Sequence, residues 1–230
     1  ILGTIAALLT VFIFLRVEKK SLKDYGLRLE KTSFLKFGLG LGTGLIIAFV
    51  LMFSQILYSD LILTKNPDVK VLPFLFWSLA FIPLAYMEEI AFRSYPLILL
   101  NKTFGLRTTQ FILAILFALY HILMNWSVQS AFLGPGIWAF VYVLAAIWSN
   151  GIALPTGLHF GLNFVQSVLG GQKGIEALWH INYPSNVSDS AIEANENFGF
   201  ALQILVLVLG IVATEYYIRK KRNKRNSLYH

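Results

Sequence analysis

The 65 residues from Thr108 to Gln172 contain no Asp, Glu, Lys or Arg. A helix that crosses the hydrocarbon core of a bilayer needs roughly 20 predominantly apolar residues. The stretch therefore has room for three such helices, joined by short turns at Leu133–Gly136 and Ser149–Gly151, where Gly, Pro and Asn favour a change of direction. This feature indicates a helical protein that crosses the membrane several times.

Composition and the other uncharged stretches agree with a membrane protein. Apolar residues make up 57% of the 230 residues, whereas soluble domains average about 45–50%. We expect an all-α transmembrane bundle of about seven or eight helices, formed as a single membrane domain by residues 1–230. The spans that hydropathy predicts lie near residues 1–15, 37–58, 71–100, 108–125, 135–149, 153–169 and 197–218.

The net charge of +7 comes largely from two basic clusters beside predicted spans. Seven Lys or Arg lie between Arg16 and Lys36, and six more between Arg219 and Arg225. Basic residues flanking spans mark the cytoplasmic side and attract anionic lipids. We therefore expect a basic cytoplasmic tail at residues 219–230, anionic membrane lipids as partners and no binding of nucleic acid. The absence of cysteine excludes disulfides and thiolate metal sites.

Five ionisable residues stand at membrane depth: Glu88, Glu89, Arg93, His121 and His159. A charged group at the centre of a span costs about 2.5–3.5 kcal/mol on insertion scales, and such groups usually face the bundle interior and mark function. Glu89 and Arg93 are four residues apart, so they share one helix face and can pair. Glu88 points about 100° away, which leaves its carboxylate available for chemistry.

The other polar groups fall at positions from which they can reach Glu88. Counted along the predicted spans, Glu88 and His121 both lie about 18–20 Å from the cytoplasmic ends of their helices. His159 and Asn163 share a face of a third helix. A carboxylate with a histidine can activate water, and a His/Asn pair can stabilise an oxyanion. Each histidine alone, or Asn163 alone, could instead serve as an interhelical hydrogen-bonding group.

Two glycine patterns favour close helix packing. The run Gly38–Gly44 does not fit the dinucleotide-binding pattern G-x-G-x-x-G and opens no strand–turn–helix unit. Small residues spaced by four in a spanning helix let neighbouring helices approach closely. Gly157 and Gly161 repeat this spacing around His159. We predict that both patterns pack helices, the second while positioning the histidine.

Three ordered motifs carry a resemblance to a known family: Glu88-Glu89-x-x-x-Arg93, Phe117-x-x-x-His121 and His159-x-x-x-Asn163. Together they resemble the CPBP (Abi) family, which comprises type II CAAX prenyl endopeptidases and proteins of bacteriocin processing or immunity. The resemblance covers a catalytic core at residues 71–169. That family usually has about eight spans, so the seven counted here imply a further segment before Ile1 or a miscounted span.

The resemblance implies an intramembrane glutamic endopeptidase, and the short, basic, cysteine-free chain is compatible with a bacterial plasma membrane. Glu88 would be the general base, and His121 would help it to activate water. His159 and Asn163 would form the oxyanion hole, while Glu89 and Arg93 would hold the site together. Its substrate would be a peptide or lipidated protein, such as a prenylated C-terminus or a pheromone or bacteriocin peptide. The oligomeric state is not readable from the sequence.

Several alternatives remain open at this point. A non-hydrolytic immunity or scaffold protein could keep the same site for binding, and Glu/His sets also form proton relays in transporters. Zinc could be held by two Glu and two His, but Arg93 beside a ligand carboxylate would oppose the cation, so we expect no metal and no other cofactor. The chain has no H-E-x-x-H motif, no G-x-S motif and no Asp in a predicted span, which excludes the usual zinc, serine and aspartyl intramembrane sites.

Overall fold

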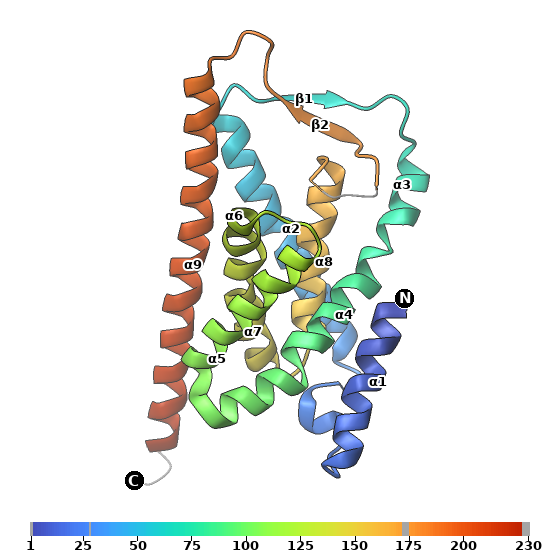
Figure 1. Cartoon of the computed structure of the whole chain (residues 1–230), viewed down its shortest axis with the longest axis vertical. Helices are drawn as coiled ribbons and strands as arrows, with labels where there is room; N and C mark the ends of the chain where they lie inside the picture. Colours follow the sequence, from blue (N-terminus) through green and yellow to red (C-terminus); the bar gives the residue numbers. More distant parts are fainter. Residues whose placement is uncertain (1, 28, 172–174, 227–230) are drawn as a thin grey trace.

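The structure is a computed structural model that describes residues 2–27, 29–171 and 175–226. Figure 1 shows a tall helical bundle with a small sheet across one end. The helices are α1 (Leu2–Val17), α2 (Ser33–Tyr58), α3 (Val71–Ser78), α4 (Phe81–Arg93), α5 (Tyr95–Leu123), α6 (Val128–Ala131), α7 (Ile137–Ser149), α8 (Ala153–Val168) and α9 (Asp189–Asn226). A 3₁₀ turn (Leu22–Tyr25) follows α1, and a π-helical turn (Phe132–Gly136) joins α6 to α7.

Four helical segments of the described chain are long and apolar enough to cross a membrane. They are 33–58, 71–123, 128–149 and 189–223, and their outward faces carry many large apolar side chains. The chain is thus an integral membrane protein. The prediction of seven or eight crossings is not confirmed, because α1 and α8 have only 16 residues each.

The predicted single span at residues 71–100 is wrong at its end. The helix is interrupted twice in this range. The first interruption separates α3 from α4. The second follows Arg93, the last residue of α4, because the backbone of Ser94 is not helical (φ −100°, ψ −109°). Helix α5 then starts at Tyr95, with Pro96 in its first turn, where the fixed φ of proline is tolerated. The first part of α5 runs across the base of the molecule until Gly105, which adopts φ 76°, after which the helix turns upward (Figure 1). Glycine adopts positive φ without steric cost.

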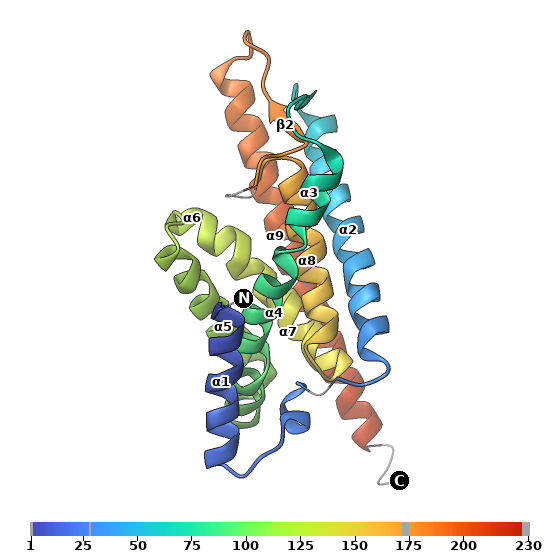
Figure 2. The ribbon, with the colours of Figure 1, turned by 90° about the vertical axis from the view of Figure 1, so that its right-hand side faces the viewer.

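The fold is not entirely helical, because two short strands pair at one end of the bundle. Strand β1 (Ile62–Lys65) lies antiparallel to β2 (Trp179–Asn182), with Ile62 opposite Asn182 and Lys65 opposite Trp179. Figures 1 and 2 show this two-stranded sheet, which joins segments far apart in the sequence, above α2, α3 and α8. The all-α prediction missed it because each strand has only four residues, too few to give a periodic pattern.

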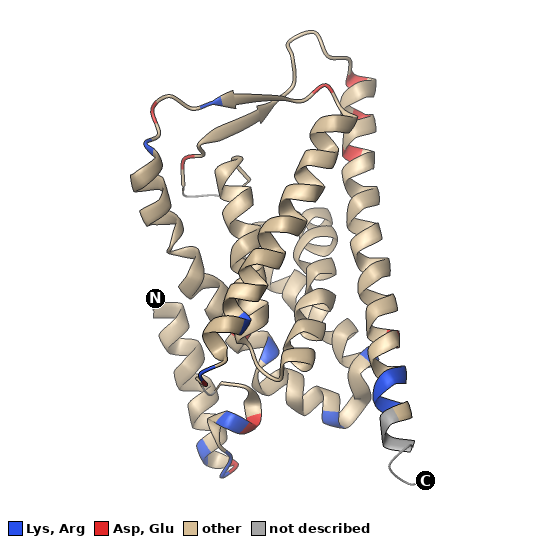
Figure 3. Ribbon diagram, turned by 180° about the vertical axis from the view of Figure 1, so that it is seen from behind, with Lys and Arg blue, Asp and Glu red and all other residues tan. Residues whose placement is uncertain are grey.

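Charged residues divide between the two ends of the bundle. Figure 3 shows most Lys and Arg at the end opposite the two-stranded sheet, with acidic residues at the start of α9 and along the sheet end; Lys65 and Lys70 are the basic exceptions there. The asymmetry matches the pattern from which the cytoplasmic side was predicted. The last part of the predicted basic tail, residues 227–230, lies outside the described residues.

Helices α2 and α8 cross at very short range through glycines on both sides. A Cβ atom on Gly40 or Gly44 would overlap the backbone of α8 at Leu154 or Leu158, and one on Gly157 would overlap that of α2. A Cβ on Gly161 would lie 2.7 Å from the Leu41 carbonyl oxygen. The prediction that both glycine patterns pack helices is therefore confirmed. This crossing fixes the height and rotation of the helix that carries His159.

Helix α7 stands at the centre of the bundle and contacts α5, α8 and α9. Its small and apolar side chains at Ala139 and Val143 are completely buried. Because α7 is enclosed on several sides, polar groups on it face protein rather than lipid. Tyr142 is one such group, and it packs against the candidate site described below.

Candidate active site

Helix α4 carries three charged residues into the protein interior. Glu88, Glu89 and Arg93 expose only 6%, 0% and 2% of their surface. Burying an isolated charge is so costly that it requires a partner. The three therefore define a site whose charges must be balanced by neighbouring helices.

The guanidinium of Arg93 is held by one carboxylate and by aromatic rings. Its Nη1 lies 3.5 Å from Glu89 Oε1, an ion pair too long for a good hydrogen bond. None of its three nitrogens has a hydrogen-bond acceptor within the described part of the chain. Instead its Cζ lies 4.1 Å from the ring centre of Phe117 and 5.1 Å from that of Tyr142. Such cation–π contacts suit the weakly hydrated guanidinium in a desolvated place.

The imidazole of His159 lies between the two carboxylates of α4. Its Nδ1 is 3.0 Å from Glu89 Oε1, and its Nε2 is 3.6 Å from Glu88 Oε2. Because Glu89 also pairs with Arg93, its ionised oxygen is the acceptor and Nδ1–H of the histidine is the donor. Tyr142 stacks on the imidazole with ring centres 4.7 Å apart and planes 20° apart. The ring is thus fixed in position, with Nε2 turned toward Glu88.

A single backbone hydrogen bond orients His121. Its Nδ1 lies 2.8 Å from the carbonyl oxygen of Phe117, one turn earlier in α5. A carbonyl can only accept, so Nδ1 carries the hydrogen and a neutral imidazole has its lone pair on Nε2. The rings of Phe117 and Trp126 pack at right angles to the imidazole, with centres 4.6 and 5.3 Å away. His121 therefore offers Nε2 as a hydrogen-bond acceptor.

One cavity of about 270 Å³ brings four of the six predicted site residues together: Glu88, His121, His159 and Asn163. They come from α4, α5 and α8, the three helices that the motifs predicted. Glu88 Oε2 is buried and has no hydrogen-bond partner among the described residues, although the cavity lies beside it. Glu89 and Arg93 do not line the cavity and lie behind the Glu88–His159 contact.

Two details of the site differ from expectation. The predicted distance of about 18–20 Å between Glu88 and the cytoplasmic end of its helix is wrong. Helix α4 ends at Arg93, so Glu88 lies only about 7–8 Å from that end. The contact between His159 and Glu89 was not predicted, since the spacing within α4 could not show which neighbour would approach. The roles assigned to these residues remain predictions.

Sequence reasoning also missed residues of the site. Tyr142 and Trp138, on α7, line the cavity, and Tyr142 contacts both His159 and Arg93. Aromatic residues are so common in this chain that neither stood out. Gln166 and Gln203 line the cavity as well; an amide within a span was the signal that could have found them.

The charge arrangement bears on metal binding. Within the described ranges, no three or more His, Asp or Glu side chains lie together in an arrangement suited to a metal ion. The guanidinium of Arg93 lies against Glu89, which in turn contacts His159. A cation bound to these ligands would be repelled by that guanidinium.

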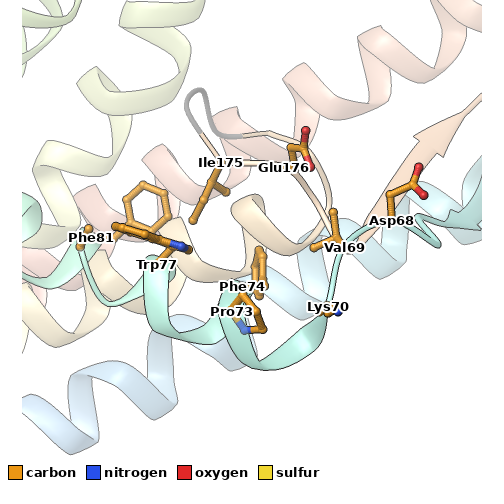
Figure 4. Close-up of a pocket in the computed structure, with 10 residues that line it drawn as sticks. Asp68, Val69, Lys70, Pro73, Phe74, Trp77, Phe81, Ile175 and Glu176 are labelled. Carbon is orange, nitrogen blue, oxygen red and sulfur yellow. The ribbon is translucent and has the colours of Figure 1, made fainter.

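A larger pocket of about 560 Å³ lies elsewhere, near the two-stranded sheet. Figure 4 shows Phe74, Trp77 and Ile175 gathered around it, with Asp68 and Glu176 toward one end. It shares no lining residue with the cavity of Glu88. It is larger than the cavity of Glu88, but it lacks the opposed acid, imidazole and amide groups that chemistry on a peptide requires.

Comparison with known proteins agrees with the motifs. Residues 70–165 match the family model described as Type II CAAX prenyl endopeptidase Rce1-like. The match contains all six predicted site residues and confirms the resemblance that the three motifs indicated. Neither the curated proteins nor the solved structures contain a match to this chain.

Proposed function

We propose, from the match of residues 70–165 to the Rce1-like type II CAAX prenyl endopeptidases, that the chain is an intramembrane endopeptidase driven by Glu88. The observation that supports it most is the shared cavity of Glu88, His121, His159 and Asn163 inside a membrane-spanning bundle. Glu88 and His121 can accept hydrogen bonds from a water molecule, and His159 and Asn163 can donate hydrogen bonds to a polarised carbonyl oxygen. That division is what hydrolysis of a peptide bond needs.

Glu88 and His121 would activate the water. Glu88 Oε2 has no hydrogen-bond partner within the described residues, and His121 presents the lone pair of Nε2. One hydrogen of a water molecule can point to each, which aims an oxygen lone pair at the substrate carbonyl. Glu88 takes the proton as the C–O bond forms and gives it to the leaving amine as the C–N bond breaks. General base catalysis of this kind contributes about 10²–10⁴-fold.

His159 and Asn163 would stabilise the oxyanion of the tetrahedral intermediate. With Nδ1 of His159 donating to Glu89, a second donor at Nε2 requires the imidazolium form. The side-chain amide of Asn163 supplies a further N–H. Removing one such donor in a hydrolase costs about 10²–10³-fold in rate.

Glu89 and Arg93 would not contact the substrate; they would hold His159 in place. Glu89 fixes the orientation of His159, and Arg93 neutralises Glu89. On this account the reaction needs no metal. The basic clusters of residues 16–36 and 219–225 would face the cytoplasm and anionic lipids, and the substrate would be a peptide or a lipidated protein.

The test is cleavage of a mixed peptide library, including farnesylated C-terminal peptides, by purified wild type and by Glu88→Gln in detergent. Glutamine keeps the shape of the side chain but is not a base. We expect products from the wild type alone, with both proteins equally folded. Cleavage by Glu88→Gln at the wild-type rate would refute the mechanism. Absence of cleavage by the wild type would instead favour the non-hydrolytic immunity or scaffold role.

A further inference from the structure

A second cavity lies beside the cavity of Glu88. It has a volume of about 480 Å³ and is bounded by α2, α6 with the following π-helical turn, α8 and α9. Five residues line both this cavity and that of Glu88: Gly134, Trp138, Leu162, Gln166 and Gln203. The two cavities are therefore neighbours that share these side chains, and we refer to the second cavity as the amide cleft.

The amide cleft is lined by glutamines from four different elements. Gln55, Gln129, Gln166 and Gln203 come from α2, α6, α8 and α9. Polar side chains within spans are costly and usually mark a pathway or a binding site. Gln203 Oε1 is buried and has no hydrogen-bond partner in the described part of the chain. Such an oxygen is an acceptor for an N–H group of a ligand.

The amide cleft lies in the half of the bundle that faces the two-stranded sheet. Its lining residues on α2 begin at Ala48, in the second half of that helix, and those on α9 lie within its first fifteen residues. Figures 1 and 2 place α6 well below the sheet, whereas α2 and α9 continue past it on the way up. Figure 3 shows that the basic clusters gather at the other end. The cleft therefore approaches the site from the side opposite the basic clusters.

We propose that the amide cleft binds the main chain of an extended peptide substrate, which reaches Glu88 from the face opposite the basic clusters. This inference rests on the proposed peptidase function. A glutamine side chain carries the same donor and acceptor groups as a peptide unit, so glutamines from several sides can satisfy a main chain that has left water. Because these amides are uncharged, the cleft suits uncharged peptide segments; its acidic residue Glu196 is exposed and would face a basic group of the peptide.

The proposal narrows the substrate class. With the basic clusters in the cytoplasm, the cleft receives a segment from the outer side of the membrane or from within the outer half of the bilayer. A cytoplasmic prenylated tail would have to come from the other side. Secreted or membrane-inserted peptides therefore fit the cleft better than cytoplasmic lipidated proteins.

Access can be measured without peptidase activity, because the chain has no cysteine of its own. The single variants Gln203→Cys and Lys20→Cys would be placed in sealed proteoliposomes and treated with a membrane-impermeant, water-soluble thiol reagent. We expect the two positions to be labelled from opposite sides of the membrane. Gly42→Cys is the matched control, since nothing lies within 4 Å of Gly42 on the outward face of α2; we expect it to stay unlabelled. Labelling of Gln203→Cys from the same side as Lys20→Cys, or from neither side, overturns the proposal.

Two experiments test whether a peptide occupies the cleft: protection of Gln203→Cys from thiol labelling, and blocking of the cleft by a bulky side chain. An excess of the peptide library should slow labelling of Gln203→Cys several-fold and leave that of Lys20→Cys unchanged; equal rates mean that lipid or water alone fills the cleft.

A Cβ on Gly199 would lie 2.5 Å from Gln55 Nε2, so a large side chain there would fill the space between α2 and α9. Gly199→Phe should lower kcat/KM by at least about tenfold, with Gly42→Phe near wild type.

The outcomes separate this proposal from the peptidase function. If Gly199→Phe does not fold, Gly199→Ala, which only displaces a flexible side chain, takes its place with a smaller expected loss. A wild type that cleaves while Gly199→Phe cleaves as fast, both folded, refutes the cleft and leaves the peptidase standing. A wild type that cleaves nothing while peptides protect Gln203→Cys refutes the peptidase and supports the cleft.

Discussion

Replacing Arg93 by methionine is expected to destabilise the protein strongly. Arg93 is 2% exposed and its guanidinium forms an ion pair with Glu89, while His159 contacts both Glu89 and Glu88. Without the guanidinium, two buried carboxylates would face one imidazole. Breaking a buried pair by removing one partner typically costs about 3–5 kcal/mol, and the lost contacts with Phe117 and Tyr142 add to this.

A second arginine provides the comparison. Arg107 on α5 makes a two-pronged contact with Glu215 on α9, but its side chain is 62% exposed. Exposed ion pairs contribute little because water already solvates both charges. The Arg107–Glu215 pair has better hydrogen-bond geometry than the Arg93–Glu89 pair. Burial is therefore the feature that should make Arg93 the more important of the two for stability. We expect Arg107→Met to leave stability nearly unchanged.

The assay is reversible unfolding of the purified variants in mixed micelles of a mild detergent and SDS. The account predicts a large loss for Arg93→Met and a partial recovery in the double variant Glu89→Gln/Arg93→Met, because glutamine removes the unpaired charge and keeps an oxygen for Nδ1–H of His159. If Arg107→Met proves more damaging than Arg93→Met, or the double variant is less stable than the single one, the charge balance described here is wrong.

Three further outcomes follow from other contacts. Gly161→Ala places a methyl group against the Leu41 carbonyl and should cost about 1–3 kcal/mol in the same unfolding assay, whereas Gly38→Ala, with open space around it, should not. Gln110 donates to the Phe140 carbonyl at 3.1 Å in a buried place, so Gln110→Leu should lower stability by about 1–3 kcal/mol. EDTA or phenanthroline should leave the cleavage rate of the wild type unchanged, and loss of activity that added zinc restores would show a metal site instead.

Much of the membrane architecture could be predicted because hydropathy is tied directly to bilayer thickness. The uncharged stretches are largely helical, although the turn predicted at Leu133–Gly136 is a π-helical turn and the chain leaves the helix at Leu123 instead. The glycines of α2 and α8 meet as their spacing indicated. The ion pair of Glu89 with Arg93 followed from helical periodicity alone. These features depend on local sequence, which is why they were readable.

The parts that could not be predicted depend on how helices meet. Hydropathy does not distinguish a helix that crosses the membrane from one that lies across its edge, so the turns at Ser94 and Gly105 were missed. Nothing in α4 or α8 alone indicates that His159 lies between both glutamates, or that Tyr142 stacks on it. Such contacts are set by the tilt and rotation of three helices at once.

The central claim is that two adjacent glutamates have different tasks, and one paired measurement tests it. Glu88→Gln and Glu89→Gln would be compared for single-turnover cleavage of the best library peptide and for the unfolding midpoint. We predict that Glu88→Gln keeps the wild-type midpoint and loses at least about 10³-fold in rate, while Glu89→Gln loses stability through unpaired Arg93. A Glu88→Gln variant that still cleaves at an appreciable fraction of the wild-type rate would contradict the account.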